Sequence, residues 1–260
     1  FQVVDTVIGK MSGVLRDPAL IASQGLKSIT PEVQRAFLVE SFNRIQIQKI
    51  VMPGFRRGLD IFEEVEDLRP FEEAKLFGHN AVHALLGYLA QLKGLREMSE
   101  LIRHPELLDM ARQAFFDEIG PALRDRHART NHPLFTREGY RAYAEDLLER
   151  MLNPHLCDQV ERICRDPARK LAPGDRLIGS MSMVIRSGRE PKHLALGAAA
   201  ALKAMLPASV ERREPGPGAL SAKLDELWGR ERPELLSECQ EAIVRAYPEL
   251  RSIAPASRES

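Results

Sequence analysis

Apolar residues recur at helical spacing through most of the chain after Pro70. Chain breakers separate the periodic segments, as at the Asp166–Pro167 and Pro173–Gly174 turns. The pattern predicts helices over residues 70–93, 105–128, 136–152, 155–165, 174–187, 191–206, 219–229 and 233–246. The predicted fold class is therefore mainly α, a multi-helical domain in which each helix buries an apolar face.

Only residues 1–7 and 41–50 are typical of β-strands, and in the second segment Ile45 and Ile47 alternate with polar side chains. Two or three strands do not make a stable sheet alone. We therefore expect edge strands of a sheet whose remainder is missing or supplied elsewhere. The first residue is Phe1 rather than Met, so we expect the chain to be a piece of a longer protein.

Composition narrows the class of protein. With 260 residues, 44% of them hydrophobic, the chain can bury a sizeable core. Lys and Arg together number 37, as do Asp and Glu, and this balance argues against nucleic acid or an anionic membrane as a partner. No apolar run approaches the ~20 residues of a membrane span. The three cysteines form no C-x2-C pair, which argues against a disulfide framework or zinc knuckle and favours the cytoplasm.

No glycine-rich dinucleotide loop is present. The G-x-G-x-x-G motif needs its glycines at fixed spacing between a strand and a helix. Gly9 and Gly13 are too far apart, and Gly54 and Gly58 also lack the spacing. The sequence predicts that this chain does not bind NAD tightly by itself.

The first predicted helix carries the sharpest chemical signal. At ~100° per residue, its polar side chains share one side of an otherwise apolar helix. These side chains are Glu72, Lys75, His79, Asn80 and His83. A buried helix must hydrogen-bond such groups or use them, because an unpaired buried polar group costs about 1–3 kcal/mol.

Spacing alone leaves three interpretations open. The polar side could be a catalytic face. It could instead hold a Glu72–Lys75 ion pair with two hydrogen-bonded histidines at a helix interface. A third interpretation is a metal site on His79 and His83, disfavoured because a catalytic metal needs a third ligand and Lys75 adds a charge to the same face.

Three ordered blocks of sequence resemble one protein family. The run KLFGHNAVH, followed by LGYLAQLKG, matches the K-x4-N-x2-H signature of the polyol-specific long-chain dehydrogenases. The later runs NPHLCDQVERICRDPARKL and GDRLI resemble the mannitol-1-phosphate branch of that family, and the opening VDTVIGKM is similar to the strand that leaves its coenzyme domain. Together these blocks span nearly the whole chain.

The resemblance implies roles on the first helix. Lys75 would be the general base that takes the hydroxyl proton, since burial lowers a lysine pKa towards useful pH. Asn80 would donate a hydrogen bond to the reacting oxygen, His83 would orient the sugar, and Glu72 would help pass the proton to solvent. Asp5 matches a position beside the reacting oxygen.

The sequence departs from the family pattern at two positions. His79 stands where an apolar residue is usual, and Val82 replaces a small glycine before the last histidine. Both changes alter the expected shape of the sugar pocket.

A second set of residues is a candidate phosphate clamp. Arg169, Lys170 and Arg176 surround a turn near a helix N-terminus, where a phosphate monoester could be held. Arginines in such loops also brace neighbouring helices, and that structural interpretation stays open.

These expectations combine into one interpretation. Residues 1–69 would be strands and linker completing a missing Rossmann-type coenzyme domain, 70–250 the helical substrate-binding and catalytic domain, and 251–260 a frayed tail. The resemblance implies NAD-dependent interconversion of D-mannitol 1-phosphate and D-fructose 6-phosphate, with NAD held mainly by the N-terminal coenzyme domain and no metal. The alternatives are a mannitol 2-dehydrogenase, a hexuronate reductase, or a non-catalytic helical binding module.

Overall fold

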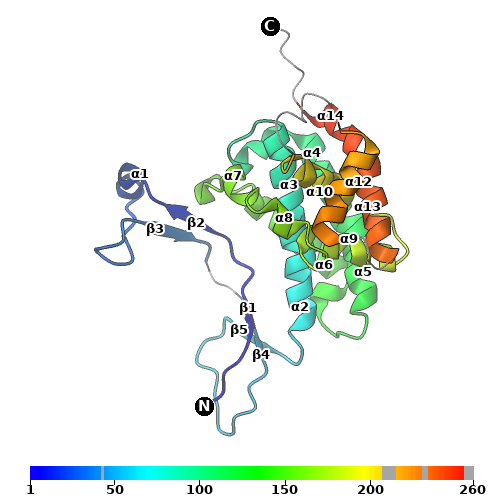
Figure 1. The fold of residues 1–260 in the computed structure, drawn as a ribbon. Helices are drawn as coiled ribbons and strands as arrows, with labels where there is room; N and C mark the ends of the chain where they lie inside the picture. Colours follow the sequence, from blue (N-terminus) through cyan, green and yellow to red (C-terminus); the bar gives the residue numbers. More distant parts are fainter. Residues whose placement is uncertain (42–43, 207–214, 230–233, 255–260) are drawn as a thin grey trace. The chain divides into compact units, whose positions relative to one another are not determined.

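The computed structural model describes residues 1–41, 44–206, 215–229 and 234–254. The described chain divides into two compact units, one formed by Phe1–Glu72 with Asn153–Asp158 and the other by Glu73–Leu152 with Gln159–Ser260. Helices dominate, as the sequence predicts (Figure 1). No helix within the described ranges combines the length and apolar character needed to cross a membrane.

The first unit contains two small sheets. Strands β1 (Thr6–Val7), β4 (Ile45–Gln48) and β5 (Phe62–Val65) form a sheet in the order β1-β4-β5, with β1 antiparallel and β5 parallel to β4. Strands β2 (Ser12–Leu15) and β3 (Ala36–Val39) pair antiparallel beside helix α1 (Pro18–Ser23).

Strands are confirmed in both expected segments, but two expectations about them are wrong. β4 lies between β1 and β5 rather than at an edge, and the two segments are not the only strands. The missed strands β2 (SGVL), β3 (AFLV) and β5 (FEEV) lack the strict alternation of apolar and polar residues that β4 (IQIQ) shows at the same length. Leu15, Ile21 and Ala36 form the small core behind β2 and β3.

The second unit is helical. Its long helices start and end close to the predicted segments, except that 155–165 is broken and that α12 begins two residues before the predicted 219. Its elements are α2 (Arg69–Glu73, which crosses the unit boundary), η1 (Ala74–His79), α3 (Asn80–Leu92), η2 (Met98–Arg103), α4 (Pro105–Gln113), η3 (Ala114–Ile119), α5 (Gly120–Arg126), η4 (Pro133–Phe135), α6 (Arg137–Met151), α7 (Val160–Ile163), α8 (Pro167–Lys170), α9 (Arg176–Arg186), α10 (Lys192–Lys203), α12 (Pro217–Trp228), α13 (Glu234–Ala246), η6 (Tyr247–Glu249) and α14 (Leu250–Ile253).

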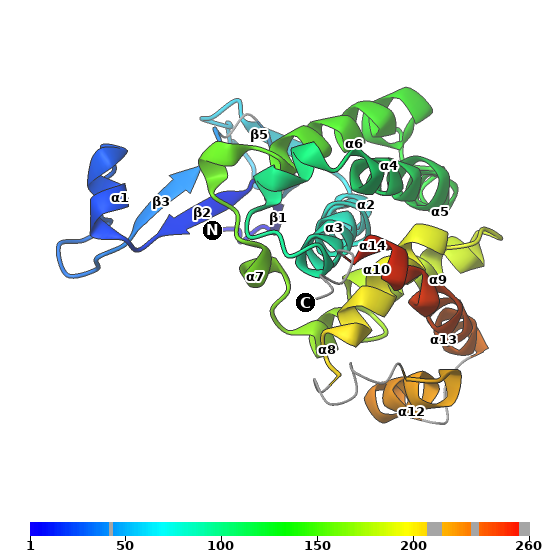
Figure 2. The ribbon, with the colours of Figure 1, turned by 90° about the horizontal axis from the view of Figure 1, so that it is seen from above.

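Helix α3 is the centre of this unit. Its side chains are apolar almost all round, and Leu85, Leu86 and Leu89 are fully buried. A helix that is hydrophobic on every side must be surrounded by others, and α9, α10 and α4 pack around it (Figure 2). Gly197 lets α10 approach closely, because a Cβ there would lie 3.1 Å from the backbone of Leu85.

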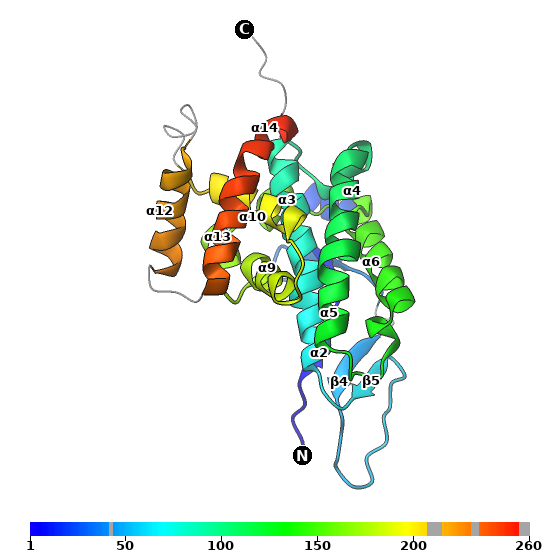
Figure 3. The same cartoon turned by 90° about the vertical axis from the view of Figure 1, so that its right-hand side faces the viewer.

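Two long helices each contain a π-helical turn, η1 and η3, that the sequence did not predict. Figure 3 shows α4–η3–α5 running beside α6, with α2 and α3 on its other side. Near η1, the buried Ser180 hydroxyl lies 3.1 Å from the Phe77 carbonyl oxygen and also contacts the Arg176 carbonyl of its own helix. Ser180 thus provides a partner at the widened turn, where helical bonding departs from the i→i−4 ladder.

Two other expectations are corrected. The predicted helix over 155–165 is instead a 3-10 turn, Pro154–Leu156, and the short α7, because Cys157 adopts a left-handed conformation with φ 47°. The start of the expected tail, residues 251–253, is not frayed, since it belongs to the helix α14 and Ile253 is buried. Residue 233, the first of the predicted helix 233–246, and residues 255–260 of the expected tail lie outside the described residues.

Candidate active site

The K-x4-N-x2-H residues lie on the α2–η1–α3 segment. Lys75 sits in the π-turn and is half-buried, Asn80 begins α3, and His83 follows one turn later; both are partly exposed. Glu72 lies in α2 and is exposed. His79 is buried, and its ring centroid lies 5.9 Å from that of His83.

The π-turn changes the relation between Lys75 and Asn80. A regular α-helix would separate two residues five apart by about 140° around its axis. Here the Asn80 backbone N–H donates to the Lys75 carbonyl, the i→i+5 bond of a π-helix. The two residues are therefore one wide turn apart, and their side chains leave the helix on the same side.

Lys75 sits in an environment that favours its neutral form. Burial lowers the pKa of the Lys75 ammonium, and no neighbouring charge contributes to the shift. No ion pair joins Lys75 to Glu72 in the described structure, so the Glu72–Lys75 ion-pair interpretation has no support there. A lowered pKa makes the neutral amine, the form that can accept a proton, accessible at lower pH than in an exposed lysine.

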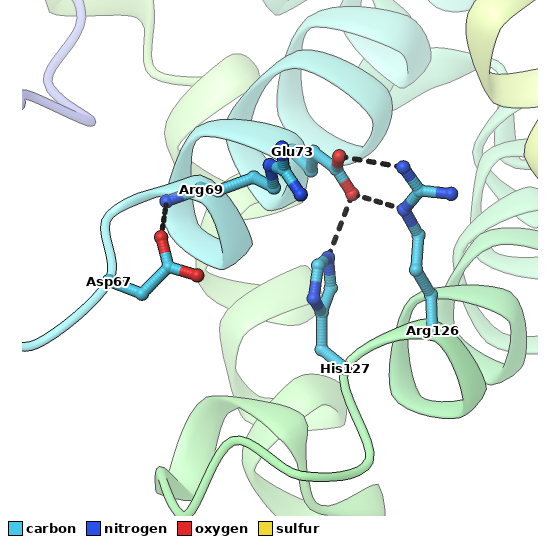
Figure 4. Close-up of polar contacts among 5 residues, drawn as sticks. All are labelled: Asp67, Arg69, Glu73, Arg126 and His127. Carbon is cyan, nitrogen blue, oxygen red and sulfur yellow. Dashed lines mark hydrogen bonds and ion pairs between the residues drawn. The ribbon is translucent and has the colours of Figure 1, made fainter.

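Glu73, which the sequence analysis did not single out, anchors the start of this segment (Figure 4). Its carboxylate accepts two hydrogen bonds from Arg126, at 2.6 and 3.0 Å, and lies 2.8 Å from Nε2 of His127. Burial acts to raise the pKa of Glu73, but the hydrogen bonds from Arg126 and His127 outweigh it and the pKa is lowered. The ion pair ties the residue just before η1 to the end of α5.

The predicted phosphate-clamp residues lie on α8 and α9. Lys170 is buried, with its ammonium 5.9 Å from the centre of the Tyr88 ring. Burial lowers the pKa of Lys170, and the charges of Arg176 and Arg169 lower it further. Both arginines therefore lie close enough to Lys170 to repel its ammonium. Arg176 is partly neutralised by Asp175, whose carboxylate lies 2.8 Å from the Arg176 Nε.

The remaining sequence-predicted residue, Asp5, is exposed and precedes β1 in the first unit. Its backbone carbonyl accepts a hydrogen bond from the Gln48 backbone N–H. Within the described ranges, no three His, Cys, Asp or Glu side chains are grouped as ligands for a metal ion.

Sequence reasoning missed Glu73 and Ser180 for the same reason. Arg126 lies 53 residues from Glu73, and Ser180 lies 103 residues from Phe77. Glu73 was visible only as the second of two adjacent glutamates, and nothing in its local pattern points to a partner at that separation.

Comparison with known proteins adds a family to this geometry. A sequence model described as the mannitol dehydrogenase C-terminal domain matches residues 67–206. A mannitol-1-phosphate 5-dehydrogenase of Bacillus licheniformis is 39% identical over 165 residues, which is 64% of this chain and 42% of that protein.

Two solved structures share the fold. The ternary complex of Pseudomonas fluorescens mannitol 2-dehydrogenase with NAD and D-mannitol superposes with a TM-score of 0.70 at 20% identity, covering 95% of this chain and 51% of that one. A substrate-free D-sorbitol dehydrogenase gives a TM-score of 0.69 at 17% identity, covering 97% of this chain and 54% of that one. This chain thus spans about half the length of these relatives or less.

Proposed function

The chain belongs to the mannitol dehydrogenase family, and from that membership we propose that it is the substrate-binding and catalytic part of an NAD-dependent polyol dehydrogenase. The proposed reaction is the reversible oxidation of D-mannitol 1-phosphate to D-fructose 6-phosphate. The observation that carries the catalytic assignment is the burial of Lys75, with its lowered pKa, in a π-turn that aligns it with Asn80.

Lys75 is the general base in this proposal. Oxidation of a secondary alcohol removes a hydroxyl proton, and a neutral amine at this position can take it. Asn80 donates an amide hydrogen bond to the same oxygen as negative charge develops on it. Their alignment one wide turn apart allows both side chains to reach one oxygen atom.

His83 and Glu72 have supporting roles. His83, one turn beyond Asn80, hydrogen-bonds the sugar and orients it. Glu72 is exposed on the turn before Lys75, so it can pass the proton from the lysine to solvent. Asp5 is proposed to contribute beside the reacting oxygen, as its match to the family pattern implies.

NAD supplies the hydride acceptor when bound, but the residues of this chain do not fit its diphosphate. No G-x-G-x-x-G loop occurs in the sequence. The N-cap of α1, after β2, is the acidic residue Asp17, whose carboxylate already accepts from the backbone N–H groups of Ala19 and Leu20. A diphosphate needs free N–H groups and no carboxylate at such a position. We therefore assign NAD binding mainly to an N-terminal coenzyme domain, which residues 1–69 would complete.

This assignment predicts that the 260-residue chain alone shows no measurable affinity for NAD. Isothermal titration calorimetry measures the affinity directly, with the same chain joined to a coenzyme domain as the positive control. Micromolar binding of NAD by the isolated chain would contradict the assignment.

The phosphate of the substrate is assigned to Arg169, Lys170 and Arg176. A dianion bound beside the buried Lys170 would offset the repulsion that Lys170 experiences from Arg169 and Arg176. Arg169 is exposed, so its removal should not disturb packing, and it is the position of choice for a test.

Arg169→Gln should lower kcat/KM for mannitol 1-phosphate about 10- to 100-fold, since a hydrogen bond to a charged group is worth about 1.5–3 kcal/mol. The rate with unphosphorylated mannitol should not change. Arg165→Gln, which removes an exposed arginine four residues earlier, is the matched control. Steady-state kinetics on the enzyme with its coenzyme domain give both values. An equal loss with both substrates would contradict the clamp, and a preference for unphosphorylated mannitol in the wild-type enzyme would favour a mannitol 2-dehydrogenase.

A further inference from the structure

A pocket of about 120 Å³ lies on the helical unit between the η3–α5 helix and α6. These elements contact one another and run side by side in Figure 3. The pocket includes no residue assigned above to catalysis or to the phosphate clamp. The lining residues that matter here are Phe116, Asp117, Arg124, Arg137, Tyr140 and Arg141.

Positive charge predominates in this pocket. The pocket is lined by three arginines, Arg124, Arg137 and Arg141, and by one carboxylate, that of Asp117. Because arginine stays protonated, the formal charge of the lining is about +2. In the described structure, none of the three arginines forms an ion pair with a carboxylate. The Arg124 Nε contacts only the Gly120 carbonyl of its own helix, at 3.4 Å.

The guanidinium group of Arg141 is held in place by a ring. It lies over the face of Phe116, 4.7 Å from the ring centroid. Stacking of this kind occupies the face of the guanidinium and leaves its N–H edge available for hydrogen bonds. The edge is the part of arginine that binds oxyanions in a bidentate manner.

Tyr140 forms the buried wall of the pocket. Its side chain is 3% exposed, and its hydroxyl has no hydrogen-bond partner in the described part of the chain. The ring packs so closely on Gly120 that a Cβ there would lie 2.6 Å from it. The hydroxyl has almost no accessible surface and lies 3.4 Å from where a Cβ of Gly78 would be. Tyr140 therefore shapes the wall of the pocket, and the polar groups available to an occupant are those of the arginines.

We propose that this pocket is a binding site for a phosphate group, either free or carried by a small metabolite, and that it is separate from the substrate site. A phosphate carries between one and two negative charges near neutral pH and has several acceptor oxygens, which matches the net charge of the pocket and the three arginines that line it. A monocarboxylate would leave one positive charge unbalanced.

The test is calorimetric titration of the 260-residue chain with inorganic phosphate at constant ionic strength, using chloride as the balancing salt. Arg169→Gln serves as the background, so that the proposed substrate clamp does not contribute. Adding Arg137→Gln and Arg141→Gln should weaken phosphate binding at least about tenfold. Both side chains are exposed, and the melting temperature checks that the variants remain folded.

The matched control is Arg129→Gln on the same background, which removes an exposed arginine outside the pocket and should leave phosphate binding unchanged. A second titration with fructose 6-phosphate separates the sources: equal affinity indicates free phosphate, and tighter binding that is lost in the pocket variants indicates a phosphorylated metabolite. The proposal is overturned if the background chain gives no phosphate-specific heat, or if the pocket variants bind as the background does. The outcome of these titrations does not depend on whether Lys75 is the general base.

Discussion

Replacing Lys75 with Ala should reduce turnover by about 10²- to 10⁴-fold, the usual contribution of a general base, while KM changes much less. The change in KM is small because the lysine acts mainly in the transition state, when the proton is moving. Lys75→Arg should not restore activity, since a guanidinium stays protonated and cannot accept the proton. The measurement is steady-state oxidation of mannitol 1-phosphate by the enzyme with its coenzyme domain.

The control for this prediction is the melting temperature of the same preparation. A lysine with a purely structural role would lower thermal stability when removed and leave the activity of each folded molecule intact. Burial lowers the pKa of Lys75, and no neighbouring charge contributes to the shift. Removal of Lys75 should therefore not destabilise the fold through the loss of an ion pair. Near-normal turnover in well-folded Lys75→Ala would remove this residue from the mechanism.

The second large effect concerns stability. Glu73→Gln should lower the free energy of unfolding by about 1–3 kcal/mol, because it leaves Arg126 and His127 without their carboxylate. The Glu73 side chain is 13% exposed, but that of Arg126 is 41% exposed, so solvent screening keeps the loss below that of a fully buried pair. Urea unfolding followed by circular dichroism measures the change. Glu72→Gln, at the exposed neighbouring position, should leave stability unchanged and is the matched control.

The effect of Glu73 should also depend on pH. The folded-state pKa of Glu73 is lower than its ordinary value, so its stabilisation is present above the unfolded pKa of about 4.3 and is lost as pH falls through the folded pKa. Wild-type and Glu73→Gln proteins should therefore differ most near neutral pH and converge in acid. A constant difference across this range, or equal stability at pH 7, would contradict the role of this ion pair.

The helical part of the fold could be predicted because its signal is local. Apolar spacing and helix breakers define the long helices, and the Pro173–Gly174 turn lies just before the start of α9 at Arg176. The π-turn at 74–79 could not be read from spacing, because its widened bonding is accompanied by contacts from α9, a hundred residues away. The strands β2, β3 and β5 were missed because their residues do not alternate strictly between apolar and polar, as those of the equally short β4 do.

The candidate site also has a part that the local sequence shows and a part that depends on contacts between distant segments. The residues from Lys75 to His83 follow one another along the chain, so their shared face and their resemblance to a family were both visible in the sequence. The ion pair of Glu73 with Arg126 joins segments whose local patterns say nothing about each other. The sequence did not show the π-turn, in which the Asn80 backbone N–H donates to the Lys75 carbonyl and which narrows the angle of about 140° that a regular helix would set between the two residues.

The most direct test of the central claim is the pH dependence of alcohol oxidation in the wild-type enzyme and in Lys75→Ala. Because only the neutral amine accepts the proton, the wild-type rate should rise with pH through a single ionisation that lies below the ~10.4 of an ordinary lysine. The residual activity of the Lys75→Ala variant should lack that ionisation. The same ionisation in the rate profile of the variant would show that another group is the base and would contradict the account.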